Sequence, residues 1–286
     1  MKIGIGLPNT IPGTPGSVLV EWARRAEARG FTTLATIDRV AYPSYESLVA
    51  LAAAGAVTER VELFTNILLA PTRNTVLLAK EAASVDQISG GRLTLGLAVG
   101  NRPDDYEAAG QPFENRGHRF DEQLQTLQEA WSGKPVSGSD KPIGPRPVRD
   151  EGIPIMIGGN FPGCFDRIVK WGVGWTAGGG PAEQAGPFAQ QVREAWKAAG
   201  KEGQPRIVAL SYFGMGPDVE TSKRTILDYY AYLGGFEKDF AEYLPRGAEA
   251  VRETVEKFEE AGIDELMFDP TIPDPAEVDL LADTVL

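Results

Sequence analysis

Short apolar runs alternate with longer amphipathic runs along the whole chain, and this alternation restricts the folds that it can adopt. Eight apolar runs have the length and composition of strands, at residues 2–7, 33–37, 61–68, 93–99, 153–157, 173–177, 206–213 and 264–268. Several are apolar on both faces, as the strands of a parallel sheet covered by helices are. Helices are expected between and after them, at 16–29, 45–59, 75–89, 116–131, 162–171, 182–199, 219–233, 247–261 and 275–285.

Eight β-α units in 286 residues are the number and size expected of a (β/α)8 TIM barrel. A doubly wound open sheet is the alternative, although it usually has fewer strands. No internal repeat or charge block indicates a second domain, so we expect a single domain over 1–286. Three insertions exceed a minimal barrel, at 101–115, 132–152 and 214–246. Loops of that length are functional lids, mobile segments or simple connectors.

Composition excludes several classes of protein. Cys164 and His118 are the only cysteine and histidine, which rules out a disulfide framework and a Cys/His zinc site, and we expect no metal. The formal net charge of −12 argues against a nucleic-acid or anionic membrane partner. No uncharged apolar run approaches the ~18 residues of a membrane span, and no signal peptide is recognisable. We therefore expect a cytoplasmic protein.

In a TIM barrel, the reacting groups lie at the carboxyl ends of the strands and in the loops that follow. Applied to the first seven predicted strands, this rule selects Pro8 and Asn9; Asp38, Arg39 and Tyr42; Asn66 with the turn 70–73; Gly100, Asn101 and Arg102; Gly158, Gly159 and Asn160; Gly178, Gly179 and Gly180; and Ser211, Tyr212 and Phe213. No lysine follows any of these strands, which counts against a Schiff-base aldolase.

Two glycine clusters, 158–160 and 178–180, each stand between a predicted strand and a predicted helix. Free backbone N–H groups at the start of a helix bind anions well, and phosphate in particular. The alternative is that the glycines only permit tight turns. Two such clusters on adjacent strands favour a phosphate site, although neither is a Walker loop or a dinucleotide fingerprint. The sequence thus predicts a phosphorylated cofactor that is held by its tail.

A family resemblance appears at residues 78–93, LAKEAASVDQISGGRL, and at 95–100, LGLAVG. This stretch closely resembles the signature of the bacterial luciferase-like flavin monooxygenase superfamily. The segments WARRAE at 22–27, NRG at 115–117 and PIMIGG at 154–159 also look like their counterparts in that family. The resemblance is strong over about residues 1–200 and looser beyond them.

The resemblance implies a TIM barrel that binds FMN or its deazaflavin analogue, coenzyme F420, with the phosphate near Gly158, Gly159, Asn160, Gly178, Gly179 and Gly180. It also implies a non-prolyl cis peptide bond at the end of the third strand. Counting back from Pro71 places that bond at Ile67–Leu68. A small-molecule substrate, a separate reductase and a homodimer are further implications.

The chain departs from the family at two positions. Many relatives carry a histidine after the acid of the second strand, where this chain has Arg39, and deazaflavin relatives often carry a glutamate where it has Asn101. His118 lies in a helix-start pattern and is expected on the surface. The usual acid-base pair is therefore absent.

The remaining candidates for catalysis are Asp38, Tyr42 and Asn101. Asp38 can donate a proton if burial raises its pKa, or it can simply cap a helix or pair with Arg39. Tyr42 can donate a phenolic proton or line the pocket. The cofactor-binding candidates are Asn66, Ile67, Leu68, Gly100, Asn101 and the two glycine clusters, with the amide of Asn66 facing the flavin ring.

Four functions remain open. The first is hydride transfer from reduced coenzyme F420 or FMN to an activated C=C, C=N or C=O bond of a small organic molecule. The second is a two-component monooxygenase that uses FMN and dioxygen. The third is a cofactor-free sugar-phosphate enzyme, and the fourth a flavin-binding protein without catalysis. The missing histidine favours the first.

Overall fold

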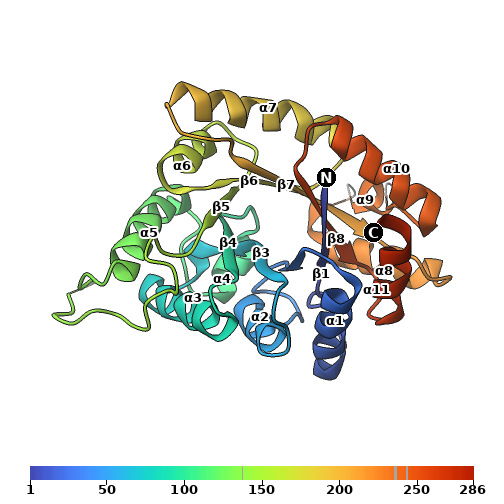
Figure 1. The fold of residues 1–286 in the computed structure, drawn as a ribbon, viewed down its shortest axis with the longest axis horizontal. Coiled ribbons are helices and arrows are strands. Elements are labelled where there is room, and N and C mark those ends of the chain that lie inside the picture. Colours follow the sequence, from blue (N-terminus) through green and yellow to red (C-terminus); the bar gives the residue numbers. More distant parts are fainter. Residues whose placement is uncertain (137, 235–236, 243) are drawn as a thin grey trace.

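The computed structural model of the chain describes residues 1–136, 138–234, 237–242 and 244–286 (Figure 1). The strands are β1 (Lys2–Gly6), β2 (Thr33–Thr36), β3 (Glu62–Leu69), β4 (Leu93–Ala98), β5 (Ile155–Gly158), β6 (Gly174–Gly179), β7 (Arg206–Phe213) and β8 (Glu265–Pro270). The helices are α1 (Gly16–Arg29), α2 (Ser47–Gly55), α3 (Thr75–Ser89), α4 (Pro103–Ala108), α5 (Arg116–Trp131), α6 (Gly163–Trp171), α7 (Ala182–Ala198), α8 (Val219–Tyr229), α9 (Glu237–Glu242), α10 (Gly247–Glu260) and α11 (Ala276–Val285). Two short 3-10 helices, η1 (Ala70–Thr72) and η2 (Ala231–Leu233), complete the elements.

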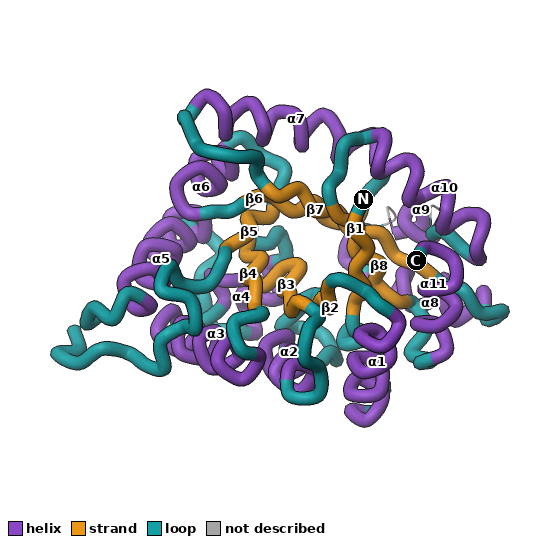
Figure 2. Tube along the Cα trace, in the orientation of Figure 1, coloured by secondary structure: helices purple, strands orange, loops and turns teal. Residues whose placement is uncertain are grey.

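All eight strands are parallel and form one closed barrel in the order β1 to β8 (Figure 2). The ring closes where β1 pairs with β8, with Ile5 opposite Phe268, and β1 pairs with β2 on its other side, with Ile5 opposite Leu34. The helices surround the barrel (Figure 1). The predicted TIM barrel is confirmed, and the closed ring excludes an open sheet.

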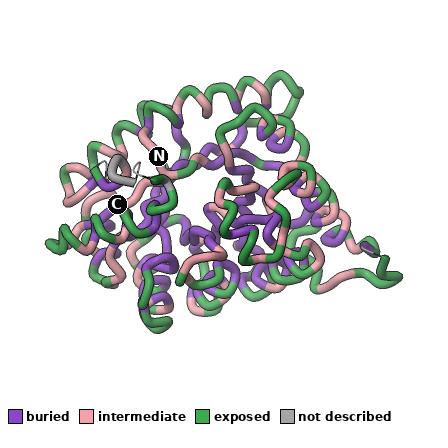
Figure 3. Tube along the Cα trace, turned by 180° about the vertical axis from the view of Figure 1, so that it is seen from behind, coloured by how far each residue is buried: buried purple, intermediate pink, exposed green. Residues whose placement is uncertain are grey.

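Both faces of the strands are apolar because both are covered. Residues that point inward form a compact middle layer in which Ala35, Phe64, Met156, Val208 and Met267 pack against one another. Residues that point outward join the main core between barrel and helices. Figure 3 shows the buried positions concentrated at the barrel, with exposed positions along the outer helix surfaces.

Below the apolar layer, an ion-pair cluster lies at the N-terminal end of the barrel. Arg206 begins β7 and donates to Glu62, at 2.6 Å, and to Glu265, which begin β3 and β8. The guanidinium carbon of Arg206 lies 5.6 Å from the ring centroid of Phe64 in the layer above. We call Arg206, Glu62 and Glu265 the floor of the barrel.

Helix α1 shows how the local pattern leads to the packing. Leu19, Trp22, Ala23 and Ala26 recur at helical spacing and are buried. Burying a leucine side chain of this kind stabilises the fold by about 1.5–3 kcal/mol. The helix ends as predicted at Gly30, whose φ of 94° is the left-handed conformation that a glycine adopts most readily.

The three predicted insertions differ in structure. Residues 101–115 contain α4, which the sequence analysis did not predict although Pro103 at its first position and two acids in its first turn are helix-start signals. The described part of 132–152 forms an irregular connection at the N-terminal end of the barrel, with a cis peptide bond before Pro145. The described part of 214–246 contains α8, η2 and α9, which lie near the carboxyl ends of the strands (Figure 1).

Helix α2 begins at Ser47 rather than at the predicted residue 45, because Glu46 accepts the backbone N–H of Val49 and caps the helix, and it ends at Gly55 rather than at residue 59. Leu48 and Leu51 of this helix are buried in the core, while Val49 is exposed. Among the described residues, no helix is both long and apolar enough to cross a membrane.

Candidate active site

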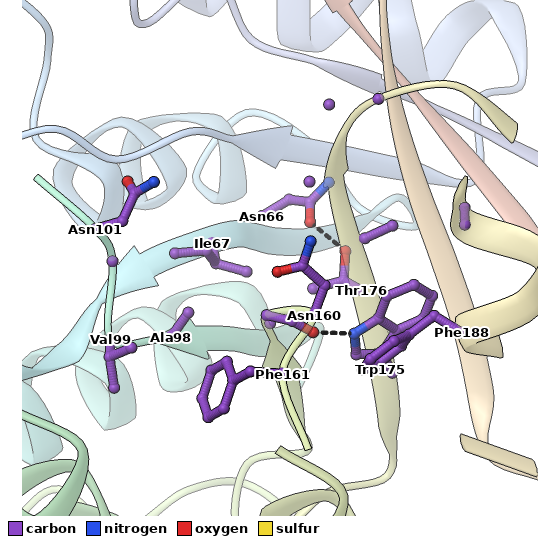
Figure 4. Close-up of a pocket in the computed structure, with 18 of the residues that line it drawn as sticks. Asn66, Ile67, Ala98, Val99, Asn101, Asn160, Phe161, Trp175, Thr176 and Phe188 are labelled. Atoms are coloured by element: carbon purple, nitrogen blue, oxygen red, sulfur yellow. Dashed lines mark hydrogen bonds between the residues drawn. The ribbon is translucent and has the colours of Figure 1, made fainter. Parts of the chain in front are cut away.

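A cavity of about 820 Å³ opens at the carboxyl ends of β3 to β6 (Figure 4). This is the end of the barrel at which TIM-barrel enzymes work, and the volume is typical of a cofactor site. The predicted site residues that line it are Asn66, Ile67, Gly100, Asn101, Gly158, Gly159, Asn160, Gly178, Gly179 and Gly180. The fold therefore brings residues from four strands and their loops to one place.

Asn66 is the most informative of these residues because half of its amide group has no partner. Its Oδ1 accepts a hydrogen bond of 2.6 Å from the hydroxyl of Thr176 on β6, across the mouth of the barrel (Figure 4). Its Nδ2 is buried and has no hydrogen-bond partner among the described residues. A buried N–H group without a partner costs about 1–3 kcal/mol. Such a group is expected where a bound molecule supplies the missing acceptor.

The expected non-prolyl cis peptide bond is present, but the predicted position was wrong by one residue. It joins Asn66 to Ile67 rather than Ile67 to Leu68. The pairing of β3 with β4 is irregular at this place, since its register shifts between Thr65 and Leu68, and counting back from Pro71 takes no account of that shift. Ile67 lines the cavity, whereas Leu68 is fully buried in the core and does not.

The two glycine clusters form adjoining parts of the cavity wall, on β5 and β6. Gly159 has a φ of 119°, and its carbonyl oxygen accepts a hydrogen bond of 2.6 Å from the indole N–H of Trp175. A Cβ on Gly178 would meet no atom within 4 Å, so the wall is open at that point. The helices α6 and α7 begin after these clusters, as the sequence predicted.

Two arginines that the sequence analysis did not select also line the cavity. Arg167 of α6 makes two hydrogen bonds to Asp121, at 2.6 and 3.1 Å. Arg116 of α5 donates to the carbonyl oxygen of Gly100 at 3.2 Å and lies 3.8 Å from the ring centroid of Phe113. Arg116 belongs to the NRG segment quoted above, but no local signal marks Arg167. The charge of Arg167 is thus paired with Asp121, whereas Arg116 places positive charge beside a wall of glycines, where an anionic group fits.

Asp38, by contrast, does not line the cavity. Arg73 donates to both of its oxygens, at 2.9 and 3.0 Å, and the backbone N–H of Leu69 donates to Oδ2 at 2.9 Å. Burial raises the pKa of Asp38, and the Arg73 charge opposes that shift. These contacts tie the end of β2 to the end of β3. A catalytic role for Asp38 stays a prediction.

Tyr42 also lies outside the cavity lining. Its hydroxyl donates to Asp228 of α8 at 2.6 Å, and burial raises the pKa of Tyr42 above its ordinary value. The guanidinium carbon of Arg39, the residue at the family's histidine position, is 5.0 Å from the Tyr42 ring centroid. Arg39 forms an ion pair of 2.8 Å with Asp104 rather than with Asp38. These contacts join the loop after β2 to α4 and α8.

His118 is exposed on α5, 3.5 Å from Glu122. Among the described residues, no group of three or more His, Cys, Asp or Glu side chains is arranged to hold a metal ion.

Comparison with known proteins identifies the family of the chain. The luciferase-like monooxygenase family matches residues 1–271. The chain is 30% identical over 224 residues to an uncharacterized protein of Mycobacterium tuberculosis. The aligned region covers 68% of this chain and 77% of the relative. It is 24% identical over 196 residues to an FMNH2-dependent dimethylsulfone monooxygenase of Pseudomonas putida. This alignment covers 64% of this chain and 52% of that enzyme.

Solved structures share the fold along the whole chain. A monooxygenase from Streptomyces bottropensis superposes with a TM-score of 0.83 at 22% identity, over 100% of this chain and 98% of the other. An F420-dependent secondary alcohol dehydrogenase, in complex with an F420–acetone adduct, superposes with a TM-score of 0.81 at 17% identity, over 99% and 98%. Enzymes with this fold thus include both monooxygenases and F420-dependent dehydrogenases. The chain belongs to the luciferase-like monooxygenase family.

Proposed function

We propose that the chain is an oxidoreductase that binds reduced coenzyme F420 or FMN in the 820 Å³ cavity and reduces an activated C=C, C=N or C=O bond of a small organic substrate. The observation that carries this proposal is the buried Nδ2 of Asn66 in the cavity wall, for which the described part of the chain offers no hydrogen-bond partner. A planar cofactor ring edged with carbonyl and nitrogen acceptors provides the group that this donor lacks.

The other residues of the cavity fit the rest of such a cofactor. The glycines of β5 and β6 leave backbone accessible, and Arg116 supplies positive charge for a phosphate-bearing tail. When bound, the reduced cofactor supplies a hydride, that is, one hydrogen with two electrons. Asn66 orients the ring, and the apolar side chains of Ile67 and Val99 keep water from its surroundings.

A two-component FMN-dependent monooxygenase is the second candidate, favoured by the similarity to the dimethylsulfone monooxygenase of Pseudomonas putida. Such an enzyme receives reduced FMN from a separate reductase and consumes dioxygen. Arg39 at the histidine position, held by Asp104, favours hydride transfer instead. The exposed His118 offers no replacement for that histidine.

Calorimetric titration of the protein with oxidised FMN and with oxidised F420 tests the proposal. We expect one of them to bind with a stoichiometry of one per chain. The preferred cofactor, in reduced form and without oxygen, should then be oxidised in the presence of a ketone or enone. No heat with either cofactor would contradict the proposal. Oxygen uptake that depends on the substrate would favour the monooxygenase.

A further inference from the structure

A second cavity, of about 330 Å³, lies apart from the site described above. Its walls come from residues 71–75 after β3, from Gln111 after α4 and from one face of α5. No residue lines both this cavity and the one of 820 Å³. Eight of its nine lining residues have polar side chains, so hydrogen bonds rather than apolar contacts would recognise a ligand here.

Gln123 of α5 supplies a buried hydrogen-bond acceptor in the wall of this second cavity. The residue is 7% exposed, and its Nε2 donates to the carbonyl oxygens of Ala70 at 3.1 Å and of Arg73 at 3.0 Å. These two bonds fix the orientation of the amide and leave Oε1 as the remaining acceptor. Oε1 has no partner among the described residues. Such an atom is expected where a molecule in the cavity supplies the missing donor.

Arg73, which also lines the second cavity, supplies a hydrogen-bond donor. Its two terminal nitrogens are held by carboxylates, Nη1 by Glu46 at 2.7 Å and Nη2 by Asp38 at 2.9 Å. Its Nε is buried and has no partner within the described part of the chain. The two carboxylates compensate the charge of Arg73 and fix its side chain. Arg73 therefore offers the cavity one oriented N–H group and no unpaired charge.

Arg119 of α5 supplies a second donor and, in addition, a positive charge. Its Nη1 donates to the carbonyl oxygen of Glu114 at 2.8 Å, and its Nη2 donates to that of Pro112. Its Nε is buried and, like that of Arg73, has no partner among the residues described. The acid in the lining, Glu122, is 66% exposed and lies 3.5 Å from His118. Since no described carboxylate pairs with Arg119, the cavity wall carries one unpaired positive charge.

We propose that the second cavity is a binding site for a small hydroxycarboxylate. The two oxygens of the carboxylate accept the Nε–H groups of Arg73 and Arg119, and the hydroxyl group donates to Oε1 of Gln123. The single negative charge of the ligand matches the single unpaired positive charge of the wall. A volume of about 330 Å³ is at the small end of the range of ligand sites. The site is independent of the function proposed above.

Other small anions fit these three groups less well. A carboxylate without a hydroxyl group satisfies both arginines but leaves Oε1 of Gln123 without a donor. Sulfate fails for the same reason, because it carries no proton at neutral pH. Phosphate can donate, but at neutral pH much of it bears two charges where the wall offers one. An amino acid has a donor, but its ammonium group brings a positive charge close to the two guanidinium groups.

Ligand-observed NMR titration of the full chain tests the ligand class, with lactate as the probe in each of its two enantiomers. Propionate is the matched control, because it differs from lactate only by the hydroxyl group. We expect one enantiomer of lactate to bind with a Kd at least about fivefold lower than that of propionate, since propionate leaves a buried acceptor unpartnered. Equal Kd values overturn the proposal. No binding of either acid also overturns it and leaves water as the occupant of the cavity.

Four variants test the location. Arg119→Lys keeps the charge and removes the Nε–H group, and Arg252→Lys makes the same change at an exposed position of α10. Thr126→Phe fills the second cavity without altering its three unpartnered groups, and Gly178→Leu obstructs the other cavity. We expect Arg119→Lys and Thr126→Phe each to raise the lactate Kd at least about fivefold, with no change in the other two. Lactate binding that survives Arg119→Lys and Thr126→Phe, or that Gly178→Leu abolishes, places the ligand elsewhere and overturns the proposal.

Discussion

The amide group of Asn66 allows stability and cofactor binding to be separated in one experiment. In the double variant Asn66→Leu with Thr176→Val, both members of the hydrogen-bonded pair become apolar side chains of similar shape. The unpartnered Nδ2 disappears at the same time. Replacing both partners of a buried hydrogen bond in this way is often neutral or stabilising.

The magnitudes follow from these contacts. Removing the buried N–H groups that have no partner relieves about 1–3 kcal/mol, and losing the bond to Thr176 costs about 0.5–1.5 kcal/mol. We therefore expect the protein without cofactor to gain about 1 kcal/mol, or a rise in Tm of about 2–4 °C. Binding should suffer, because an acceptor on the cofactor loses its donor at a cost of about 1–3 kcal/mol. That loss is about a 5- to 150-fold rise in Kd.

Urea unfolding without cofactor and calorimetric titration with FMN or F420 provide the two measurements. Thr65→Val is the control, because Thr65 is a buried neighbour on β3 that donates to the carbonyl oxygen of Gly96 and does not line the cavity. It should lower stability and leave Kd unchanged. A double variant that binds the cofactor as tightly as the wild type would refute the assignment of Asn66 as a cofactor ligand.

Three further predictions concern other parts of the molecule. A Cβ on Gly178 meets no atom within 4 Å, so Gly178→Leu should leave the unfolding midpoint unchanged. It should raise the cofactor Kd at least about tenfold, with Gly178→Ala intermediate. Equal Kd values for the wild type and both variants would contradict the phosphate site. Burial raises the folded-state pKa of Asp269, at the end of β8, well above its ordinary value. Its contribution to stability is therefore present in full below about pH 4 and is lost as pH rises towards that pKa. In urea titrations, Asp269→Asn should gain in stability relative to wild type from pH 4 to 8, and a constant difference would show that the carboxyl group is not buried and neutral. Cys164 is fully buried and burial raises its thiol pKa to about 11, so iodoacetamide at pH 7.5 should alkylate it only after unfolding, as mass spectrometry would show.

The barrel could be predicted from the sequence because its strands are local apolar runs and its helices carry their own stop signals. Gly30 and Gly90 end α1 and α3 in the left-handed conformation, as expected of glycines after a helix. The cavity could be predicted for a related reason. The carboxyl ends of neighbouring strands must meet once the barrel closes, so Asn66, Gly100, Gly158 and Gly178 had to converge.

The pairings between loops could not be predicted. The sequence offered Arg39 as the partner of Asp38, but the partner is Arg73 from the next β-α loop, and Arg39 pairs with Asp104. Such choices depend on how separate loops pack, which no local pattern records.

The floor of the barrel affects the order in which cofactor and substrate bind and leave. Arg206, Glu62 and Glu265 occupy the end of the barrel opposite the cavity, and the packed interior layer that contains Phe64 and Met267 lies between them and the cavity. In the proposed reaction, the redox carrier and the organic reactant both enter through the cavity at the carboxyl ends of the strands, and whichever binds deeper enters first and departs last. Steady-state inhibition patterns should accordingly show ordered rather than random binding.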